Sequence, residues 1–163
     1  MLNPLELAHR FLAEVIVPGD LVVDATMGQG YDTVFLAGLK ADVVAFDVQA
    51  LALAMTEKRL EQAQLTAKLI LDGHENVGQY IEQPIKAAIF NLGYLPKSDK
   101  QVITQAETTL DALTQLLEML VKGGTVSSNH PDAADNIQWV GTDGTRNIKK
   151  YTTKNTCSGK RNR

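Results

Sequence analysis

The residues best suited to chemistry lie in the stretch Val22–Thr33, where an apolar run ends in an acidic residue and two glycines follow. This order predicts a buried strand that ends at Asp24, a turn at Gly28 and Gly30, and then a helix. A second apolar run ends at Asp47, 17 residues after Gly30. A glycine turn lets a ligand approach the backbone, and a carboxylate at the next strand end can accept both hydroxyls of a ribose. The pattern therefore predicts a site for a ligand that contains adenosine.

Alternating strands and helices must position these residues. Helices are expected over residues 4–16, 31–39, 50–63, 75–81 and 107–121, and strands over 21–25, 42–47, 67–72 and 87–92, with a fifth strand beginning within 125–128. Thr108 or Thr109 is the expected N-cap of the last helix, and Gly123-Gly124 its end. The strands are short, continuous apolar runs, which is typical of a parallel sheet covered on both faces. We therefore predict an α/β, Rossmann-like, doubly wound and mostly parallel sheet with helices on both faces, whose last strands are missing or altered.

Polar residues stand at or just past the ends of four successive predicted strands: Asp24, Asp47, Asp72 and Asn91. Right-handed crossovers bring the carboxyl ends of parallel strands to one edge of a sheet. Ligands bind in the crevice at that edge. These four side chains are therefore expected to line one site.

Length and charge suggest one domain with an unusual end. Residues 1–126 are expected to form the ligand-binding domain, and residues 127–163 a divergent polar and basic tail. Residues 146–163 carry seven of the 16 basic residues and none of the 19 acidic ones. Such a tail can bind phosphate, although charge alone favours a solvated end without a specific role.

Composition also bounds the environment of the protein. No apolar run is long enough to cross a membrane, and the N-terminus does not resemble a signal peptide. The single cysteine, Cys157, excludes an internal disulfide and disfavours a zinc cluster. We therefore expect a cytoplasmic protein without a metal site, and the sequence does not indicate its oligomeric state.

The glycine turn is not the G-x-G-x-x-G of dinucleotide-binding proteins, because Thr33 stands where the third glycine would be. It is closer to the D-x-x-x-G-x-G pattern of class I methyltransferases, whose cofactor, S-adenosylmethionine, has no pyrophosphate. A nicotinamide dehydrogenase is disfavoured, because no residue suited to a hydride site accompanies the turn.

Two further segments are more specific than the glycine turn: Asp72-Gly73-His74-Glu75-Asn76, and Asn91-Leu92-Gly93-Tyr94-Leu95-Pro96. The second resembles the (N/D)-P-P-(Y/F) motif of enzymes that methylate amino groups. Together with the glycine turn, they make the chain resemble a bacterial family of putative rRNA methylases, members of which methylate the aminomethyl group of a modified wobble uridine in tRNA. The resemblance covers about residues 5–126, in the segments Ala8-His9, Val23–Thr33, Ala45–Gln49, Asp72–Asn76, Ile89–Pro96 and Thr108–Gly124.

The resemblance implies S-adenosylmethionine as cofactor and an RNA substrate, tRNA being favoured over rRNA. It implies catalytic roles for Asn91, whose amide oxygen would orient the amine, and Tyr94, which would stack on the base. The cofactor would be bound by Asp24, Thr26, Gly28, Gly30, Asp32, Asp47, Gln49, Asp72, His74 and Asn91.

Several of these residues also have a purely structural interpretation. Asp24 can support the glycine loop, Thr26 can cap the turn, and Asp32 can stabilise the helix dipole. His74 can be a structural hydrogen-bonding residue, and His9 is expected to pack rather than to reach the cofactor. For the whole protein, the alternatives are a methyltransferase acting on rRNA, protein or a small amine, and a non-catalytic module that binds S-adenosylmethionine or a nucleotide.

The chain departs from the family pattern after Gly124, where an apolar fifth strand and a final strand pair are expected. Our hypothesis is a disrupted C-terminus, through a reading-frame change or a divergent truncation. The coding DNA tests the first version, which requires a shifted frame that encodes an apolar, family-like tail.

Overall fold

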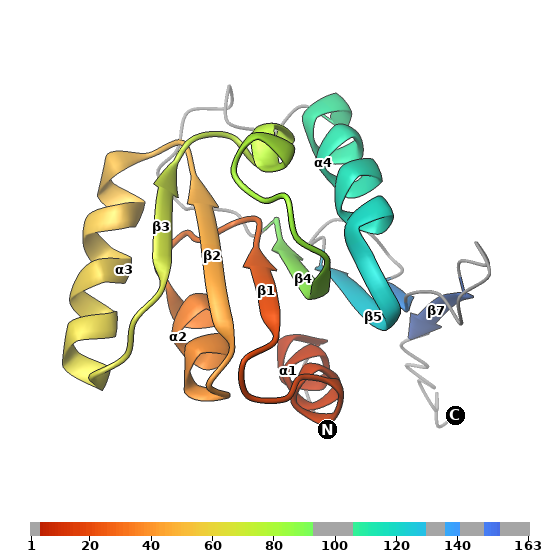
Figure 1. The fold of residues 1–163 in the computed structure, drawn as a ribbon, viewed down its shortest axis with the longest axis horizontal. Helices are drawn as coiled ribbons and strands as arrows, with labels where there is room; N and C mark the ends of the chain where they lie inside the picture. Colours follow the sequence, from red (N-terminus) through yellow and green to blue (C-terminus); the bar gives the residue numbers. More distant parts are fainter. Residues whose placement is uncertain (1–3, 93–105, 130–135, 141–148, 154–163) are drawn as a thin grey trace, which may run out of the picture.

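The computed structural model describes residues 4–92, 106–129, 136–140 and 149–153 of the 163-residue chain. Its elements are α1 (Pro4–Val15), β1 (Leu21–Asp24), α2 (Tyr31–Gly38), β2 (Asp42–Asp47), α3 (Ala50–Ala63), β3 (Lys68–Leu71), the 3-10 helix η1 (His74–Gln79), β4 (Ile85–Asn91), α4 (Ala106–Met119), β5 (Leu120–Asn129), β6 (Asn136–Val140) and β7 (Lys149–Thr153). The described strands form one sheet in the order β3-β2-β1-β4-β5-β6-β7 (Figure 1). Strands β1 to β5 pair in parallel, whereas β6 and β7 run antiparallel to their neighbours.

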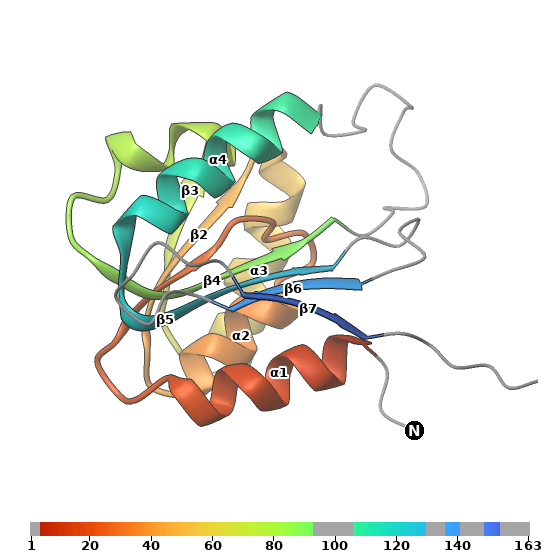
Figure 2. The same ribbon diagram turned by 90° about the vertical axis from the view of Figure 1, so that its right-hand side faces the viewer.

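Helices cover both faces of the sheet (Figure 2). Val23, Phe46 and Phe90 pack on one face, in a core closed by η1 and α4. The neighbouring residues Val22 and Ile89 point to the other face, where α1, α2 and α3 close a second core. Because both faces are buried, successive residues in the middle of β1, β2 and β4 are apolar, which accounts for the continuous runs in the sequence. The predicted α/β, doubly wound architecture is confirmed.

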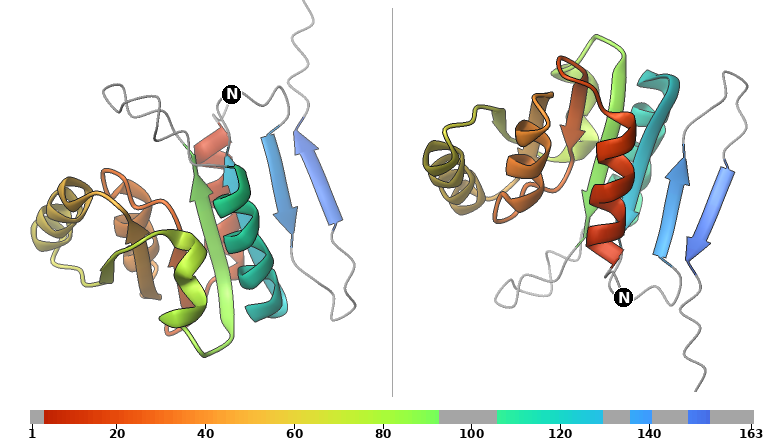
Figure 3. Two further views of the ribbon diagram at one scale, coloured as in Figure 1. Left: turned by 90° about the horizontal axis from the view of Figure 1, so that it is seen from above. Right: turned by 90° about the horizontal axis from the view of Figure 1, so that it is seen from below.

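The centre of the sheet is β1, which lies between β2 and β4. The chain proceeds outward from β1 in one direction through β2 and β3, and then returns to the other side of β1 as β4. Figure 3 shows the same arrangement from above and below, with α4 and α1 on opposite faces beside β4 and β5. In open α/β sheets, ligands bind at the carboxyl end of the strands at such a reversal point.

The end of α4 differs from the prediction. The helix ends at Met119, and Leu120 and Val121 already belong to β5. Pairing with β4 shifts between Ile85 and Ala87, so the glycines form an irregularity in the strand. Gly123 has φ +76°, and a Cβ on Gly124 would lie 2.9 Å from the carbonyl oxygen of Lys86. The glycines therefore allow a bulge and a close backbone approach instead of ending a helix.

The predicted N-cap of α4 is also wrong. The helix begins at Ala106, so Thr108 and Thr109 both lie inside its first turn. The acidic residue of that turn is Glu107, which is favourable near a helix N-terminus.

The region expected to be a separate tail contributes strands to the same sheet. Thr125, Val126 and Ser127 of β5 pair with Val140, Trp139 and Gln138 of β6, and β6 pairs in turn with β7. The predicted domain boundary at residue 126 falls inside β5. None of the helices in the described part of the chain is both long and apolar enough to span a membrane.

Candidate functional site

The candidate site lies at the carboxyl ends of β1 to β4. Asp47 and Asn91 are the last residues of β2 and β4, and Asp72 directly follows β3. Asp24 ends β1 opposite Ala45 and Ile89, and is therefore two residues short of its neighbours' ends. The predicted gathering of polar residues at one edge is confirmed, but Asp24 lies at a deeper level than the other three.

The glycine loop fills the space above Asp24. The N–H of Ala25 donates to the oxygen of Ile89 over 2.9 Å, and the N–H of Met27 donates to the oxygen of Phe46 over 2.9 Å. The loop is thus held between the ends of β2 and β4 before it turns into α2.

Glycine is favoured at the two glycine positions of this loop for different physical reasons. Gly28 has φ +52°, and among the described residues, its chain neighbours aside, the only atom within 4 Å of its missing Cβ is the oxygen of Thr26 at 3.8 Å. Gly30 has φ +85°, and a Cβ there would lie 2.8 Å from Cα of Thr56 in α3. Open space above Gly28 leaves room for a ligand, whereas Gly30 is required by the close packing of α3 against the loop.

Asp47 joins the glycine loop to the start of α3. Its Oδ2 accepts from the N–H of Gly28 over 2.9 Å, and its Oδ1 accepts from the N–H of Gln49 over 2.9 Å. Its side chain is half-buried. A carboxylate has about four lone-pair sites, so Asp47 can still accept two hydroxyl groups while it holds the loop. Gln49 is the N-cap of α3 and contributes through its backbone, without a side-chain cap.

Asp24 is fully buried and supports the loop from below. Its Oδ1 accepts from the N–H of Thr26 over 3.1 Å, and its Oδ2 accepts from the Thr33 hydroxyl over 2.7 Å. Its pKa is raised to about 7, first by burial and second by the nearby charge of Asp32, against the opposing effect of these hydrogen bonds. The observed contacts correspond to the loop-support interpretation of Asp24.

Asn91 is held by its backbone and by its side chain. Its N–H donates to the hydroxyl oxygen of Thr26 over 2.6 Å. Its Nδ2 donates to Oδ2 of Asp32 over 3.2 Å. The other oxygen of Asp32 lies 2.6 Å from Nε2 of His9 in α1. Thr26 and Asp32 therefore both contact Asn91, which sequence reasoning did not anticipate.

His9 packs as predicted, but it also has a polar contact. Its ring stacks on Phe35, with 3.8 Å between the ring centroids and 1° between the planes. The bond to Asp32 joins α1 to the start of α2, 23 positions apart. No local pattern in the sequence indicates a contact over that separation.

Asp72 and His74 organise the segment after β3. Asp72 accepts from the N–H of Gly73, the amide of Asn76 and the hydroxyl of Tyr80, and these hydrogen bonds, led by that of Tyr80, lower the pKa of Asp72. Nδ1 of His74 lies 3.0 Å from the carbonyl oxygen of Ala25, which can only accept, so Nδ1 carries the donated hydrogen. Nε2 of His74 is buried without a partner among the described residues.

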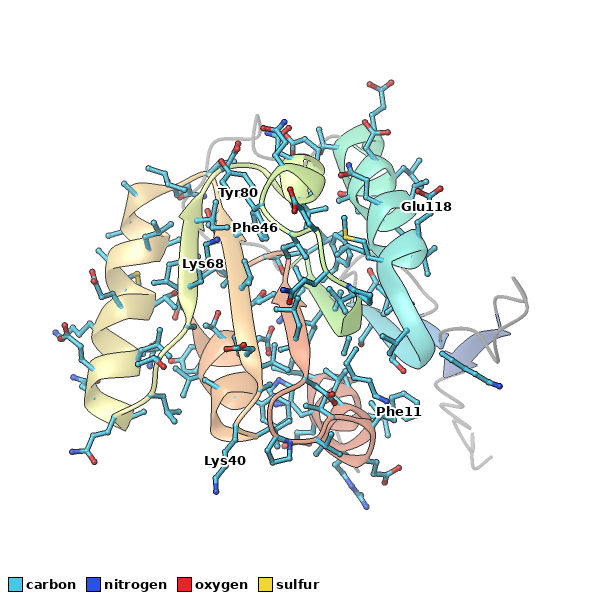
Figure 4. The ribbon with its side chains drawn as sticks, in the orientation of Figure 1. Phe11, Lys40, Phe46, Lys68, Tyr80 and Glu118 are labelled. Carbon is cyan, nitrogen blue, oxygen red and sulfur yellow. The ribbon has the colours of Figure 1, made fainter. Side chains whose placement is uncertain are left out.

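Apolar side chains also reach the surface at this edge. Val48 follows Asp47 and is 63% exposed. Asp47 pairs with Leu71, so Val48 and Asp72 are neighbours just past the strand ends. Figure 4 shows Tyr80 beside Phe46 near the same edge, and their rings meet edge to face at 5.6 Å, whereas Lys40 points away at the opposite end of the sheet. Sequence reasoning missed Val48 and Tyr80, although their positions beside Asp47 and the D-G-H-E-N segment could have pointed to them.

Tyr94 lies outside the described residues. Among the described residues, no group of three or more His, Cys, Asp or Glu side chains is placed to hold a metal ion. A groove of about 430 Å³ between α3 and β3 contains none of the strand-end residues; it is lined by Leu53, Glu57, Leu60, Glu61, Leu65, Thr66, Ala67 and Leu69.

Comparisons with known proteins identify the family of the chain. The sequence model of the family described as "Putative rRNA methylase" matches residues 43–129, more than half of the chain. The chain is 33% identical over 154 residues to a chloroplastic tRNA (mnm(5)s(2)U34)-methyltransferase of Arabidopsis thaliana, covering 83% of this chain. It spans only 56% of that relative's length.

Two solved structures are also similar. An rRNA methylase from Streptococcus thermophilus is 45% identical, with a TM-score of 0.69 over 78% of this chain and 71% of the other. A putative methyltransferase from Streptococcus mutans, in complex with SAH, is 38% identical, with a TM-score of 0.76 over 93% of this chain and 96% of the other. The family model and these relatives show that the chain belongs to the rRNA methylase family of S-adenosylmethionine-dependent methyltransferases.

Proposed function

We propose that this protein transfers a methyl group from S-adenosylmethionine to an amino group of an RNA, and specifically to the aminomethyl group of a modified wobble uridine in tRNA. The observation that carries the proposal is the position of Asn91, which ends β4 beside the glycine loop and is held there by Thr26 and Asp32. The name of the Arabidopsis relative supports the choice of tRNA.

The residues at the edge fit the cofactor. Asp47 keeps free lone pairs for the ribose hydroxyls while it accepts two backbone N–H groups. The space above Gly28 is open to a ligand that approaches the backbone. The exposed side chain of Val48 offers an apolar surface for the adenine ring next to Asp72.

Held by Asp47 and the glycine loop, the cofactor would supply a methyl group activated by its sulfonium, and the neutral thioether would be the leaving group when the amine nitrogen bonds to the methyl carbon. Asn91 would accept a hydrogen of the neutral amine and so direct the nitrogen lone pair at that carbon. The proton released by the product passes to water. Positioning of this kind supplies on the order of several kcal/mol, and a strong base is not required. Tyr94 would stack on the substrate base.

The test is incubation of the protein with labelled S-adenosylmethionine and tRNA that carries the unmethylated aminomethyl wobble base. Label is expected in the tRNA, and nucleoside mass spectrometry is expected to find one added methyl on the aminomethyl group. The control is the same tRNA with an unmodified wobble uridine, which has no amine to accept the label. Label in the control at the same level would contradict the proposed substrate.

rRNA is the second candidate substrate, favoured by the family description and by the Streptococcus thermophilus structure. Ribosomal RNA from a deletion strain, tested in parallel, decides between the two. Tight binding of the cofactor with no transfer to either RNA would favour a non-catalytic binding module instead.

A further inference from the structure

Three side chains from three separate elements form one hydrogen-bonded chain beside the candidate site. His9 of α1 contacts Asp32 of α2 over 2.6 Å, and Asp32 contacts Asn91 of β4 over 3.2 Å. The side chain of Asp32 is 6% exposed and that of His9 is 22% exposed. A partly buried series of hydrogen bonds of this kind holds its members in one arrangement, because breaking it leaves the nearly buried carboxylate of Asp32 without a partner.

The hydrogen bond between Asp32 and Asn91 determines which way the side-chain amide of Asn91 faces. A carboxylate only accepts hydrogen bonds, so the Asn91 atom that meets Asp32 must be the NH₂ nitrogen. The amide is planar, and its oxygen then faces away from Asp32. The backbone bond from Asn91 to the Thr26 hydroxyl fixes the residue from its other side.

Asp32 is itself held by His9. Nε2 of His9 must donate to the carboxylate, and stacking of the ring on Phe35 keeps that nitrogen in place. Loss of the donor would leave one oxygen of a nearly buried carboxylate unpaired. Without that donor, the carboxylate of Asp32 is no longer fixed in one orientation, and its hydrogen bond to the NH₂ group of Asn91 is weakened.

We propose that His9 and Asp32 are positioning residues for methyl transfer, and that they act by presenting the amide oxygen of Asn91 to the substrate amine. The inference rests on the proposed role of Asn91. An amide turned by half a rotation would place its NH₂ group against the N–H of the amine, donor against donor, and the lone pair would no longer be directed at the methyl carbon.

The first measurement needs neither substrate nor cofactor. In the free protein, the side-chain NH₂ of Asn91, identified in an NMR spectrum by its disappearance in Asn91→Asp, is expected to show one hydrogen shifted by its bond to the carboxylate. Asp32→Ala and His9→Phe are expected to remove or reduce that shift. An unchanged signal in Asp32→Ala would overturn the proposal.

The second measurement uses two matched substitutions. His9→Phe keeps a ring against Phe35 but removes the donor, whereas His9→Gln keeps a donor and removes the ring. We expect His9→Phe to lower kcat roughly tenfold or more without changing the affinity for SAH, and His9→Gln to recover most of that loss. Glu14→Gln, an exposed change on the same helix, is the control and is expected to behave as the native protein.

A double-mutant cycle with Asn91→Ala separates the possible outcomes. If His9 acts through Asn91, adding His9→Phe to Asn91→Ala causes no further loss of kcat. A full additional loss of kcat, or a fall in SAH affinity with His9→Phe, would show that His9 does not act through Asn91 and would overturn the proposal. Native turnover in Asn91→Ala would instead contradict the proposed function of Asn91 itself.

Discussion

Asp24 and Asp47 are both acidic residues that end neighbouring parallel strands, yet they have different environments. Asp47 ends β2 and is half-buried, with oxygens that hold the glycine loop. Asp24 ends β1 two residues lower in the register and is covered by that same loop. A difference of two residues in strand length therefore separates a group suited to bind a ligand from one that supports the backbone around it.

The first prediction concerns the cofactor affinity of Asp47→Ala. This change removes both the proposed ribose acceptor and the partner of the Gly28 N–H, so SAH should bind roughly tenfold or more weakly in calorimetry. The matched control is Asp42→Ala, an exposed acidic residue at the other end of the same strand. Equal affinity in native protein and Asp47→Ala would refute the ribose assignment.

The second prediction concerns stability against pH. Because the pKa of Asp24 is raised from 3.8 to about 7 in the folded state, chiefly by burial, folding favours the protonated form. The resulting stabilisation is complete below the ordinary pKa and is lost as the pH rises through about 7. The contribution of this group to the free energy of unfolding should fall by on the order of a few kcal/mol from about pH 4 to about pH 8.

Urea unfolding of the native protein and of Asp24→Asn across that range measures this contribution. The substitution keeps the size of the side chain and removes its titration, so the stability of the variant should fall less with rising pH. Parallel curves for the two proteins would be inconsistent with a raised pKa at Asp24.

At the scale of elements, the glycine loop is shaped by its contact with α3. Gly30 is the N-cap of α2 and has a left-handed backbone, and Thr56 of α3 lies directly against it. On the outer side, Nε of Arg59 donates to the oxygen of Gln29 over 2.7 Å, and its guanidinium lies 3.8 Å from the centroid of the Tyr31 ring. Helix α3 thus holds the loop from two sides, and the position proposed to face the ligand, Gly28, depends on this packing.

The third prediction compares three glycine-to-alanine changes. Gly30→Ala adds a Cβ within 3 Å of Thr56 to a backbone that disfavours it, and should lower the free energy of unfolding by about 2 kcal/mol or more. Gly28→Ala has only the backbone cost, about 1 kcal/mol, but should weaken SAH binding. Gly38→Ala in α2 is the control. A Cβ at this position would have no atom of the described residues within 4 Å beyond its own helix and chain neighbours, so the change should be neutral or stabilising. A smaller loss for Gly30→Ala than for Gly28→Ala would contradict the packing role.

For the whole molecule, strands β6 and β7 determine where the sheet ends. They extend it beyond β5, so that β5 is flanked on both sides (Figure 2). Thr125 and Ser127 are buried and pair across to Val140 and Gln138. Without these partners, the backbone N–H and C=O groups of β5 would form a free edge open to pairing with another chain.

The fourth prediction follows from that edge. A chain shortened to end at Asn129 should lose thermal stability and aggregate, because the edge of β5 is then unpaired. A chain shortened to end at Thr153 keeps both strands and is the control. Light scattering and thermal unfolding measure the difference, and equal behaviour of the two shortened chains would show that β6 and β7 do not protect β5.

Features that depend on short-range pattern could be predicted from the amino-acid order. Continuous apolar runs between helical segments predicted a parallel sheet covered on both faces, and polar residues after those runs predicted the polar edge with Asp47, Asp72 and Asn91. The prediction that Gly123-Gly124 ends the last helix was wrong, because a glycine pair is equally suited to a helix end and to a bulge against another strand.

Which strand-end groups are covered, and which side chains meet, depends on how the elements pack in three dimensions. Burial of Asp24 depends on the register between β1 and its two neighbours, and the packing of Gly30 depends on α3. The chain from His9 through Asp32 to Asn91 joins residues 23 and 59 positions apart. Contacts over such separations depend on how completed elements pack against each other, and hydrophobic periodicity within one element carries no information about that packing.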